Sequence, residues 1–217
     1  MQLRKKFALS CSSVIIAASA AACSVSPAPE DIEGVGSDAL VAGWGGVGVC
    51  NQADPYEKNN RLWSATELAY YDVYAGSGWG AAYTSATAFI CKKDQDWYFM
   101  STSDLPFMPG WLSIRAQAAG ASYCPVYEYE EDGVTYTWGY DPPAGPESTI
   151  QIDVYSAGTL QLVASAQSNI GRIFLDTYDG PMEQDLYLRV RGPKEAYYGY
   201  NLSVRVQTHA FEDECEY

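Results

Sequence analysis

Short segments rich in Tyr, Val, Ile and Thr recur through most of the chain, separated by Gly, Pro and Asp. Such segments are typical of β-strands, because β-branched and aromatic side chains pack well on a pleated sheet. The expected strands cover 84–90, 96–101, 111–117, 123–130, 133–139, 149–155, 160–166, 171–177, 185–191 and 200–207. Only residues 61–71 offer a helical pattern, and it is weak. Many short strands without helices between them predict an all-β fold, an antiparallel sandwich or barrel.

One predicted hairpin carries an unusual set of aromatic side chains. Its strands alternate on either side of Glu131-Asp132-Gly133, where Gly supplies a positive φ. The residues at alternating positions are Tyr127, Tyr129, Tyr136, Trp138 and Tyr140. One face of the hairpin is therefore aromatic, and two interpretations stay open. The face is either core, or a ligand-binding surface formed by the first four residues that stacks on sugar rings or on peptide.

The N-terminus has the pattern of a secretory signal. Arg4-Lys5-Lys6 precedes an apolar and small-residue stretch that ends at Ala22, so residues 1–22 are predicted to be a signal peptide. Ala20-Ala21-Ala22-Cys23 resembles a bacterial lipobox, with Ala20 where Leu is usual, which implies lipidation of Cys23. Plain cleavage near the same alanines is the alternative. Both predict an exported protein, either a cell-envelope lipoprotein or an extracellular protein.

The following segment, 23–49, predicts a flexible tether. It contains Pro27, Pro29, an acidic patch and six Gly, which is a composition typical of linkers. The domain that it carries is expected to cover 50–217.

Four cysteines lie within this expected domain: Cys50, Cys91, Cys124 and Cys215. An even number in an exported chain predicts two disulfides, and three connectivities are possible. A zinc site is the weaker interpretation, because no two of these cysteines lie within a few residues of each other.

Charge and the scarcity of histidine narrow the function. The net charge of −14 repels phosphate backbones and anionic lipid, so nucleic acid is not an expected partner and membrane contact is expected only through the lipid anchor. The chain has one His, His209, and neither a Gly-x-Ser-x-Gly nor a His-Glu-x-x-His motif. Its densest acidic cluster, at 128–132, is predicted to be a solvated turn. These features predict a protein that is not an enzyme.

Three patterns together resemble the bacterial pre-peptidase C-terminal domain. The first is Asp-Pro-Tyr-Glu-Lys-Asn-Asn at 54–60 followed by Ala-Thr at 65–66. The second is the strand at 89–99, which runs through Asp-x-Asp-Trp-Tyr, and the third joins 186–190 to 200–204. Lys58 and Lys93 stand where that family usually has Pro and Gly. The resemblance implies a jelly-roll-like β-sandwich, related to collagen-binding and carbohydrate-binding modules and usually an accessory to exported enzymes.

The resemblance also implies a disulfide pairing and a metal. Cys50–Cys91 and Cys124–Cys215 are expected, because Cys50 and Cys91 directly precede two signatures that the family brings together. Calcium prefers six to eight oxygen ligands, and the candidate side chains at this junction are Asp54, Glu57, Asn59, Asn60, Asp94 and Asp96. The alternative is that these residues form turns and caps through local hydrogen bonds.

The expected function is non-catalytic binding or display at the cell envelope, with a polysaccharide or protein as the partner. Two alternatives remain, a small secreted hydrolase and a secretion or stability accessory without a ligand of its own. A run Gly76-Ser77-Gly78-Trp79-Gly80 suggests a phosphate loop but lacks the Lys and helix that such a loop requires, so it predicts an ordinary loop. The oligomeric state is left open.

Overall fold

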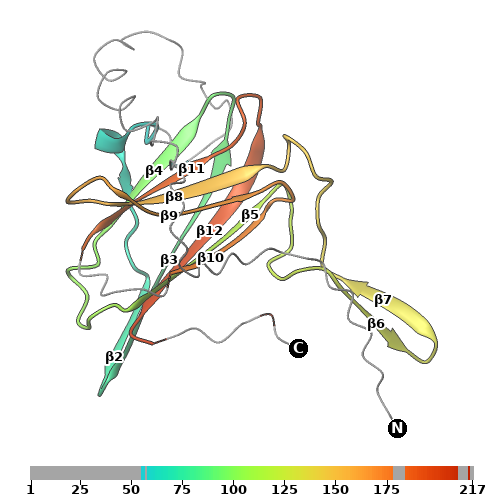
Figure 1. Cartoon of the computed structure of the whole chain (residues 1–217), viewed down its shortest axis with the longest axis horizontal. Coiled ribbons are helices and arrows are strands. Elements are labelled where there is room, and N and C mark those ends of the chain that lie inside the picture. The colour runs from blue at the N-terminus through green and yellow to red at the C-terminus, as the bar shows by residue number, and fades with distance from the viewer. Residues whose placement is uncertain (1–54, 57, 178–183, 210–214, 216–217) are drawn as a thin grey trace, which may run out of the picture.

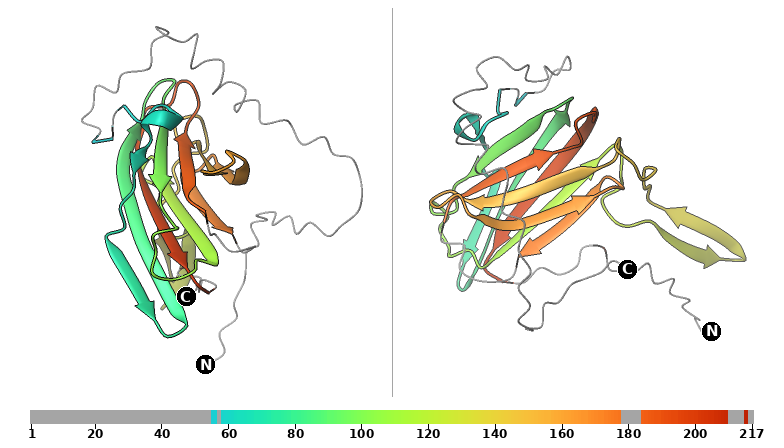
Figure 2. Two further views of the ribbon diagram at one scale, coloured as in Figure 1. Left: turned by 90° about the vertical axis from the view of Figure 1, so that its left-hand side faces the viewer. Right: turned by 45° about the horizontal axis from the view of Figure 1, so that its top comes forward.

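Two five-stranded sheets and one separate hairpin make up the fold in the computed structural model, which describes residues 55–56, 58–177, 184–209 and 215 (Figure 1). The two sheets lie face to face, as Figure 2 shows. The predicted all-β, antiparallel sandwich is confirmed.

Each sheet is built from strands that are distant in sequence. The first sheet contains, in order, β1 (Thr66–Glu67), β4 (Gln95–Met100), β11 (Leu186–Arg191), β8 (Ile150–Ser156) and β9 (Leu162–Ser168). The second contains β10 (Arg172–Thr177), β5 (Trp111–Ala118), β12 (Tyr198–Gln207), β3 (Trp79–Ile90) and β2 (Asp72–Gly76). The hairpin pairs β6 (Tyr127–Glu131) with β7 (Val134–Trp138). Neighbouring strands are antiparallel, except that β1 runs parallel to β4.

The core lies between the two sheets and follows from the alternation of side chains along each strand. Leu188 and Val154 point inward from the first sheet, and Ile114, Leu202 and Val204 point inward from the second. All five are buried. Burial of these apolar side chains is the main stabilising contribution to the sandwich.

One buried ion pair lies on the outer side of the first sheet, opposite the core. Arg189 donates to Asp153 Oδ2 from Nε at 3.0 Å and from Nη2 at 2.7 Å, and both side chains are almost fully buried. The guanidinium carbon lies 5.4 Å from the Trp97 ring centroid and 5.5 Å from that of Tyr155. Burial alone would raise the pKa of Asp153, but hydrogen bonds from Ser165 and Arg189 lower it below the ordinary value.

The N-terminal part of the sandwich departs from the sequence prediction. The weak helical pattern at 61–71 becomes a three-residue 3₁₀ turn, η1 (Leu62–Ser64), followed by β1. The predicted loop at 76–80 is the turn between β2 and β3, in which Gly78 adopts a φ of 81°. Both strands were missed because β1 has only two residues and β2 exposes most of its side chains.

Among the described residues, none forms a helix that is long and apolar enough to cross a membrane. The predicted signal peptide (1–22), Cys23 and the predicted tether (23–49) all lie outside the described residues.

Candidate binding site

The hairpin of β6 and β7, here called the arm, projects away from the sandwich (Figures 1 and 2). Its turn contains Asp132 with a φ of 53° and Gly133 with a φ of 76°. Positive φ at both central residues is the backbone conformation that matches the twist of a two-residue hairpin. The predicted hairpin and its turn are confirmed.

The two faces of the arm differ in chemistry. The strand register places Tyr127 opposite Trp138 and Tyr129 opposite Tyr136, so these rings share one face. The other face carries the pairs Glu128–Thr137 and Glu130–Thr135. The arm is therefore an amphipathic ribbon with one aromatic and one acidic, hydroxyl-bearing face.

The aromatic face is exposed, so the interpretation of this face as core is wrong. The exposed fractions are 38% for Tyr129, 42% for Tyr136 and 59% for Trp138, and Tyr127 is half-buried. The physical reason is the position of the arm: it leaves the edge of the sandwich (Figure 1), and it pairs with neither large sheet. The alternation correctly predicted which residues share a face, but it does not determine whether another layer packs against that face.

The rings stabilise the arm by stacking on one another. Tyr129 and Tyr136 lie with centroids 5.1 Å apart and planes at 17°, and Tyr127 is 6.2 Å from Tyr129. A two-stranded hairpin is marginally stable in water. Cross-strand aromatic pairs contribute roughly 0.2–1 kcal/mol each, which helps this arm to hold its shape without a core.

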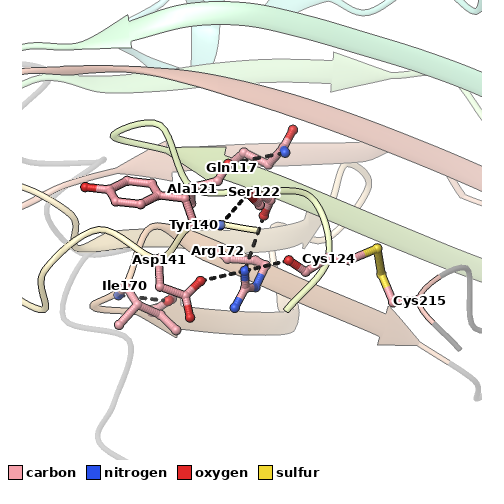
Figure 3. A network of polar contacts seen from close by, with 10 residues as sticks. Gln117, Ala121, Ser122, Cys124, Tyr140, Asp141, Ile170, Arg172 and Cys215 are labelled. Carbon is pink, nitrogen blue, oxygen red and sulfur yellow. Dashed lines mark hydrogen bonds and ion pairs between the residues drawn. A yellow bond between two sulfur atoms is a disulfide. The ribbon is translucent and has the colours of Figure 1, made fainter. Parts of the chain in front are cut away.

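The base of the arm is held by a single arginine (Figure 3). Arg172, the first residue of β10, donates from Nη1 to the carbonyl oxygen of Cys124 at 2.9 Å. It also forms an ion pair with Asp141, with Nη1 2.7 Å from Oδ1. Cys124 lies on the segment that enters the arm, and Asp141 lies on the segment that leaves it. The buried guanidinium therefore joins both segments to the second sheet.

Further contacts close the same base (Figure 3). Ser122 N donates to Tyr140 O at 2.8 Å, and Tyr140 N donates to Ser122 Oγ at 2.7 Å. The chain leaves the arm through Gly139, whose φ is 90° and where a Cβ would lie 3.3 Å from Val126 Cα. This combination of a left-handed φ and a close approach requires glycine.

A disulfide joins the segment that enters the arm to the C-terminal region. Cys124 and Cys215 are bonded, with Cα atoms 5.5 Å apart, which is the expected pairing (Figure 3). Cys91 is also disulfide-bonded. Its expected partner, Cys50, lies outside the described residues.

The two sequence patterns that were expected to hold calcium do meet in space. Trp97 N donates to Asn59 O at 2.9 Å, and Gln95 Nε2 donates to Asn60 O at 3.2 Å. Asp94 Oδ1 accepts from Gln95 N at 2.9 Å. The junction of 59–60 with 94–97 is therefore a hydrogen-bonded connection between a turn and β4.

The side chains at this junction hydrogen-bond to one another. With its amide oriented to suit both neighbours, Asn59 donates to Tyr56 O at 2.9 Å and to Asp96 Oδ1 at 2.8 Å. Asp96 Oδ2 accepts from Tyr200 OH at 2.7 Å, and burial together with Asp96 raises the pKa of Tyr200 well above its ordinary value. Both Asn59 and Asp96 are buried.

These contacts suit the capping interpretation better than a calcium shell. The described part of the chain contains no group of three or more His, Cys, Asp or Glu side chains placed to hold a metal ion. Two of the predicted ligands, Asp54 and Glu57, lie outside the described residues. Calcium binding at this junction stays a prediction.

Arg172 holds the arm base, and the sequence did not predict this role. An arginine that opens a strand has no distinctive spacing, and its partners at the arm base, Ser122, Cys124 and Asp141, are 50, 48 and 31 positions away in the sequence. The only available signal was the length of the segment 122–146 between two strong strand patterns.

Comparison with known proteins leaves the family open. No family model matches the chain, and no curated protein matches it. Among the solved structures that match is the crystal structure of the Yersinia pseudotuberculosis-derived mitogen, with 9% identity and a TM-score of 0.36, covering 61% of this chain and 92% of that one. Similarity at that TM-score supports no conclusion about this chain. The resemblance to the pre-peptidase C-terminal domain stays a prediction.

Proposed function

We propose that the chain is an exported, non-catalytic binding protein of the cell envelope that binds a protein partner through the arm. The observation that carries this proposal is the exposed aromatic face of Tyr127, Tyr129, Tyr136 and Trp138 on a projecting hairpin. An apolar surface of this kind on a soluble domain usually marks an interaction site. Tyr and Trp are also the side chains that most often dominate binding energy at protein interfaces.

The stacking within the arm favours a protein partner over a sugar polymer. Because Tyr129 and Tyr136 stack face to face with centroids 5.1 Å apart, each ring covers one face of the other and leaves less ring surface for a sugar. Ring edges and the Trp138 side chain remain free to enter an apolar groove. The acidic face, with Glu128 and Glu130, then adds a rim that complements lysines or arginines beside such a groove.

A rigid base supports the same proposal. Arg172 and the Cys124–Cys215 disulfide hold the arm at both of its entry segments. A preorganised arm loses less conformational entropy on binding than a flexible loop does. The fixed base is therefore an asset for binding, whereas a purely structural hairpin at the surface would not need one.

Membrane attachment completes the proposal. Lipid on Cys23 and the 24–49 tether would hold many arms near one surface, so that weak contacts gain avidity. Cell fractionation tests this part: we expect the wild-type protein in the membrane fraction and the Cys23→Ala variant in the soluble fraction. A wild-type protein found entirely in the soluble fraction would remove the anchor from the proposal.

The hydrolase alternative gains little support from the described side chains. Glu128, Glu130 and Glu131 are exposed on the arm, where water has free access to each carboxyl group. His209 is exposed, and its Nε2 lies 2.9 Å from Gly78 O. Since all four of these side chains are exposed, they do not form the water-excluding site that acid–base catalysis requires.

The binding proposal is tested by retention on fibrous protein. The full chain is incubated with fibrillar collagen and gelatin, and bound protein is compared for wild type and for Tyr136→Ala with Trp138→Ala. We expect at least a tenfold loss of retention in the double variant. The matched control is Trp63→Ala, which removes an exposed Trp far from the arm and should bind as wild type does. Equal binding by wild type and the double variant would contradict the proposal.

A further inference from the structure

The outer face of the second sheet carries a second aromatic surface that no part of the proposed function uses. Tyr74 of β2 and Trp79 of β3 are exposed by 49% and 43%, and their ring centroids lie 6.2 Å apart with planes at 40°. Tyr83 stands edge-on to Tyr74 at 6.4 Å. Tyr74 OH donates to Asp72 Oδ2 at 2.8 Å, which fixes the direction of that ring.

One ring of this group is already covered. The guanidinium carbon of Arg205 lies 5.1 Å from the Tyr83 centroid, so Arg205 occupies a face of Tyr83. The exposed ring faces are therefore those of Tyr74 and Trp79. Of the three rings, Tyr74 and Trp79 are therefore the two that are available to a ligand.

Hydroxyl and amide groups continue the same surface along β3. Side chains of one strand alternate between faces, so the residues that share the outer face with Trp79 follow at every second position. The same face carries several neutral polar side chains: Ser85, Thr87, Asn201, Ser203 and Gln117. Thr87 Oγ1 donates to Asn201 Oδ1 at 2.9 Å. From Trp79 to Phe89 the strand gives a track about 33 Å long.

The charges on this face cancel. The charged side chains are the ion pairs Arg115–Asp176 and Arg172–Asp141, together with Arg205 and Asp72. Three positive and three negative charges leave the face neutral, in a chain whose net charge is −14. Because the face is neutral and the remaining surface repels polyanions, the complementary partner is an uncharged polymer.

We infer that this face, here called the sheet platform, binds a neutral, hydroxyl-rich polysaccharide chain. Aromatic ring faces carry negative charge density and attract the slightly positive C–H face of a sugar ring. Ser, Thr, Asn and Gln side chains both donate and accept hydrogen bonds, as sugar hydroxyls require. A protein partner fits less well, since interface cores are depleted in serine.

The sheet platform is independent of the arm. Its aromatic and neutral polar residues lie on β2, β3, β5 and β12, whereas the arm consists of β6 and β7. The two surfaces meet only at the Arg172–Asp141 ion pair of the arm base. The chain therefore has two surfaces of different chemistry, one for a polysaccharide and one for a protein. Failure of either surface in a binding test leaves the other untouched.

Affinity measurements with cellulose and amylose test this inference, with alginate as the polyanion comparator. We expect the full chain to bind at least one neutral polymer and not alginate. Trp79→Ala should weaken that binding about tenfold, which corresponds to about 1.4 kcal/mol, and Thr87→Val should weaken it by a few-fold through loss of one hydroxyl. Trp63→Ala and the arm variant Trp138→Ala are the controls, and both should bind as wild type does.

Four results would overturn the inference. The first is that neither neutral polymer is bound, and the second is that Trp79→Ala binds as well as Trp63→Ala. The third is that sedimentation shows self-association of the wild-type chain that Trp79→Ala abolishes, which would make this face a contact between copies. Binding that is lost in Trp138→Ala but kept in Trp79→Ala would assign the polysaccharide to the arm and also contradict it.

Discussion

The sandwich and the arm use the same sequence pattern for opposite purposes. In β12, alternate residues such as Leu202 and Val204 are buried between two sheets. In β6 and β7, alternate residues such as Tyr129 and Tyr136 remain exposed and stack only on each other. Only the sandwich has a second layer over the alternating face, so alternation identifies a face but not its environment.

The largest contrast is expected between two ion pairs. Asp153→Ala, in the sandwich, leaves Arg189 buried without its carboxylate and should cost about 3–5 kcal/mol. Asp141→Ala, at the arm base, removes a carboxylate that is 32% exposed, and the Arg172 guanidinium keeps the carbonyl oxygens of Ser122 and Cys124 as acceptors, so the change should cost only about 1–2 kcal/mol. Urea unfolding of both variants measures the difference, and equal losses would break the distinction between body and arm.

The same pair predicts how stability depends on pH. The pKa of Asp153 in the folded chain is below the ordinary value of 3.8. Its contribution is therefore fully present above pH 3.8 and is lost as the pH falls through the lower, folded value. The Asp153→Ala variant should show a smaller loss of stability than wild type across that acidic range.

Core truncation provides the next contrast. Leu188→Ala should cost about 2–5 kcal/mol, because it removes buried methyl groups and leaves a cavity. Tyr136→Ala removes a larger side chain but should cost less than about 1 kcal/mol, the scale of a cross-strand pair. Thermal and urea unfolding give both values, and a large loss for Tyr136→Ala would show that the arm belongs to the cooperative unit of the body.

The disulfide tests how the arm base contributes to the body. Cys124 and Cys215 are separated by 91 residues, and the closed loop includes β6 through β12. Replacing both cysteines by Ser should lower the free energy of unfolding by about 2–4 kcal/mol. The double variant is preferable to a reductant, because Cys91 is also disulfide-bonded. An unchanged free energy of unfolding would confine the disulfide to a local role.

Calcium gives the smallest expected effect. The hydrogen bonds of Asn59 and Asp96 account for the junction without a metal, and they predict equal melting temperatures in chelator and in millimolar Ca²⁺. The family resemblance predicts a rise instead, by RT ln(1 + [L]/Kd) in free energy. A higher melting temperature in calcium would show that the complete chain holds the metal at or beyond these residues.

The sequence predicted the strands of the body well for a physical reason. Strands such as β8 and β11 combine β-branched residues with alternation, so local propensity and burial agree. Strands β1 and β2 were missed because tertiary pairing, and not local pattern, creates them. The aromatic residues of the arm were identified, but their exposure depends on where the hairpin leaves the sheet, which no local pattern encodes.

The same limit applied to the sheet platform. Tyr74 and Trp79 lie on either side of a Gly-Ser-Gly turn that the sequence analysis treated as a loop. Their proximity follows from strand pairing, and their polar neighbours come from β5 and β12, which lie far along the chain. To predict a surface of this kind, one must know the order of the strands in the sheet, and the positions of the strands in the sequence do not determine that order.

The central claim is that the aromatic face of the arm serves binding and not the stability of the body. Its most direct test combines retention on fibrillar collagen and gelatin with urea unfolding, for wild type and for Tyr136→Ala with Trp138→Ala. We expect at least a tenfold loss of retention, with a change in unfolding free energy of no more than about 1–2 kcal/mol. Retention that is unchanged, or a loss of stability as large as that of Leu188→Ala, would contradict it.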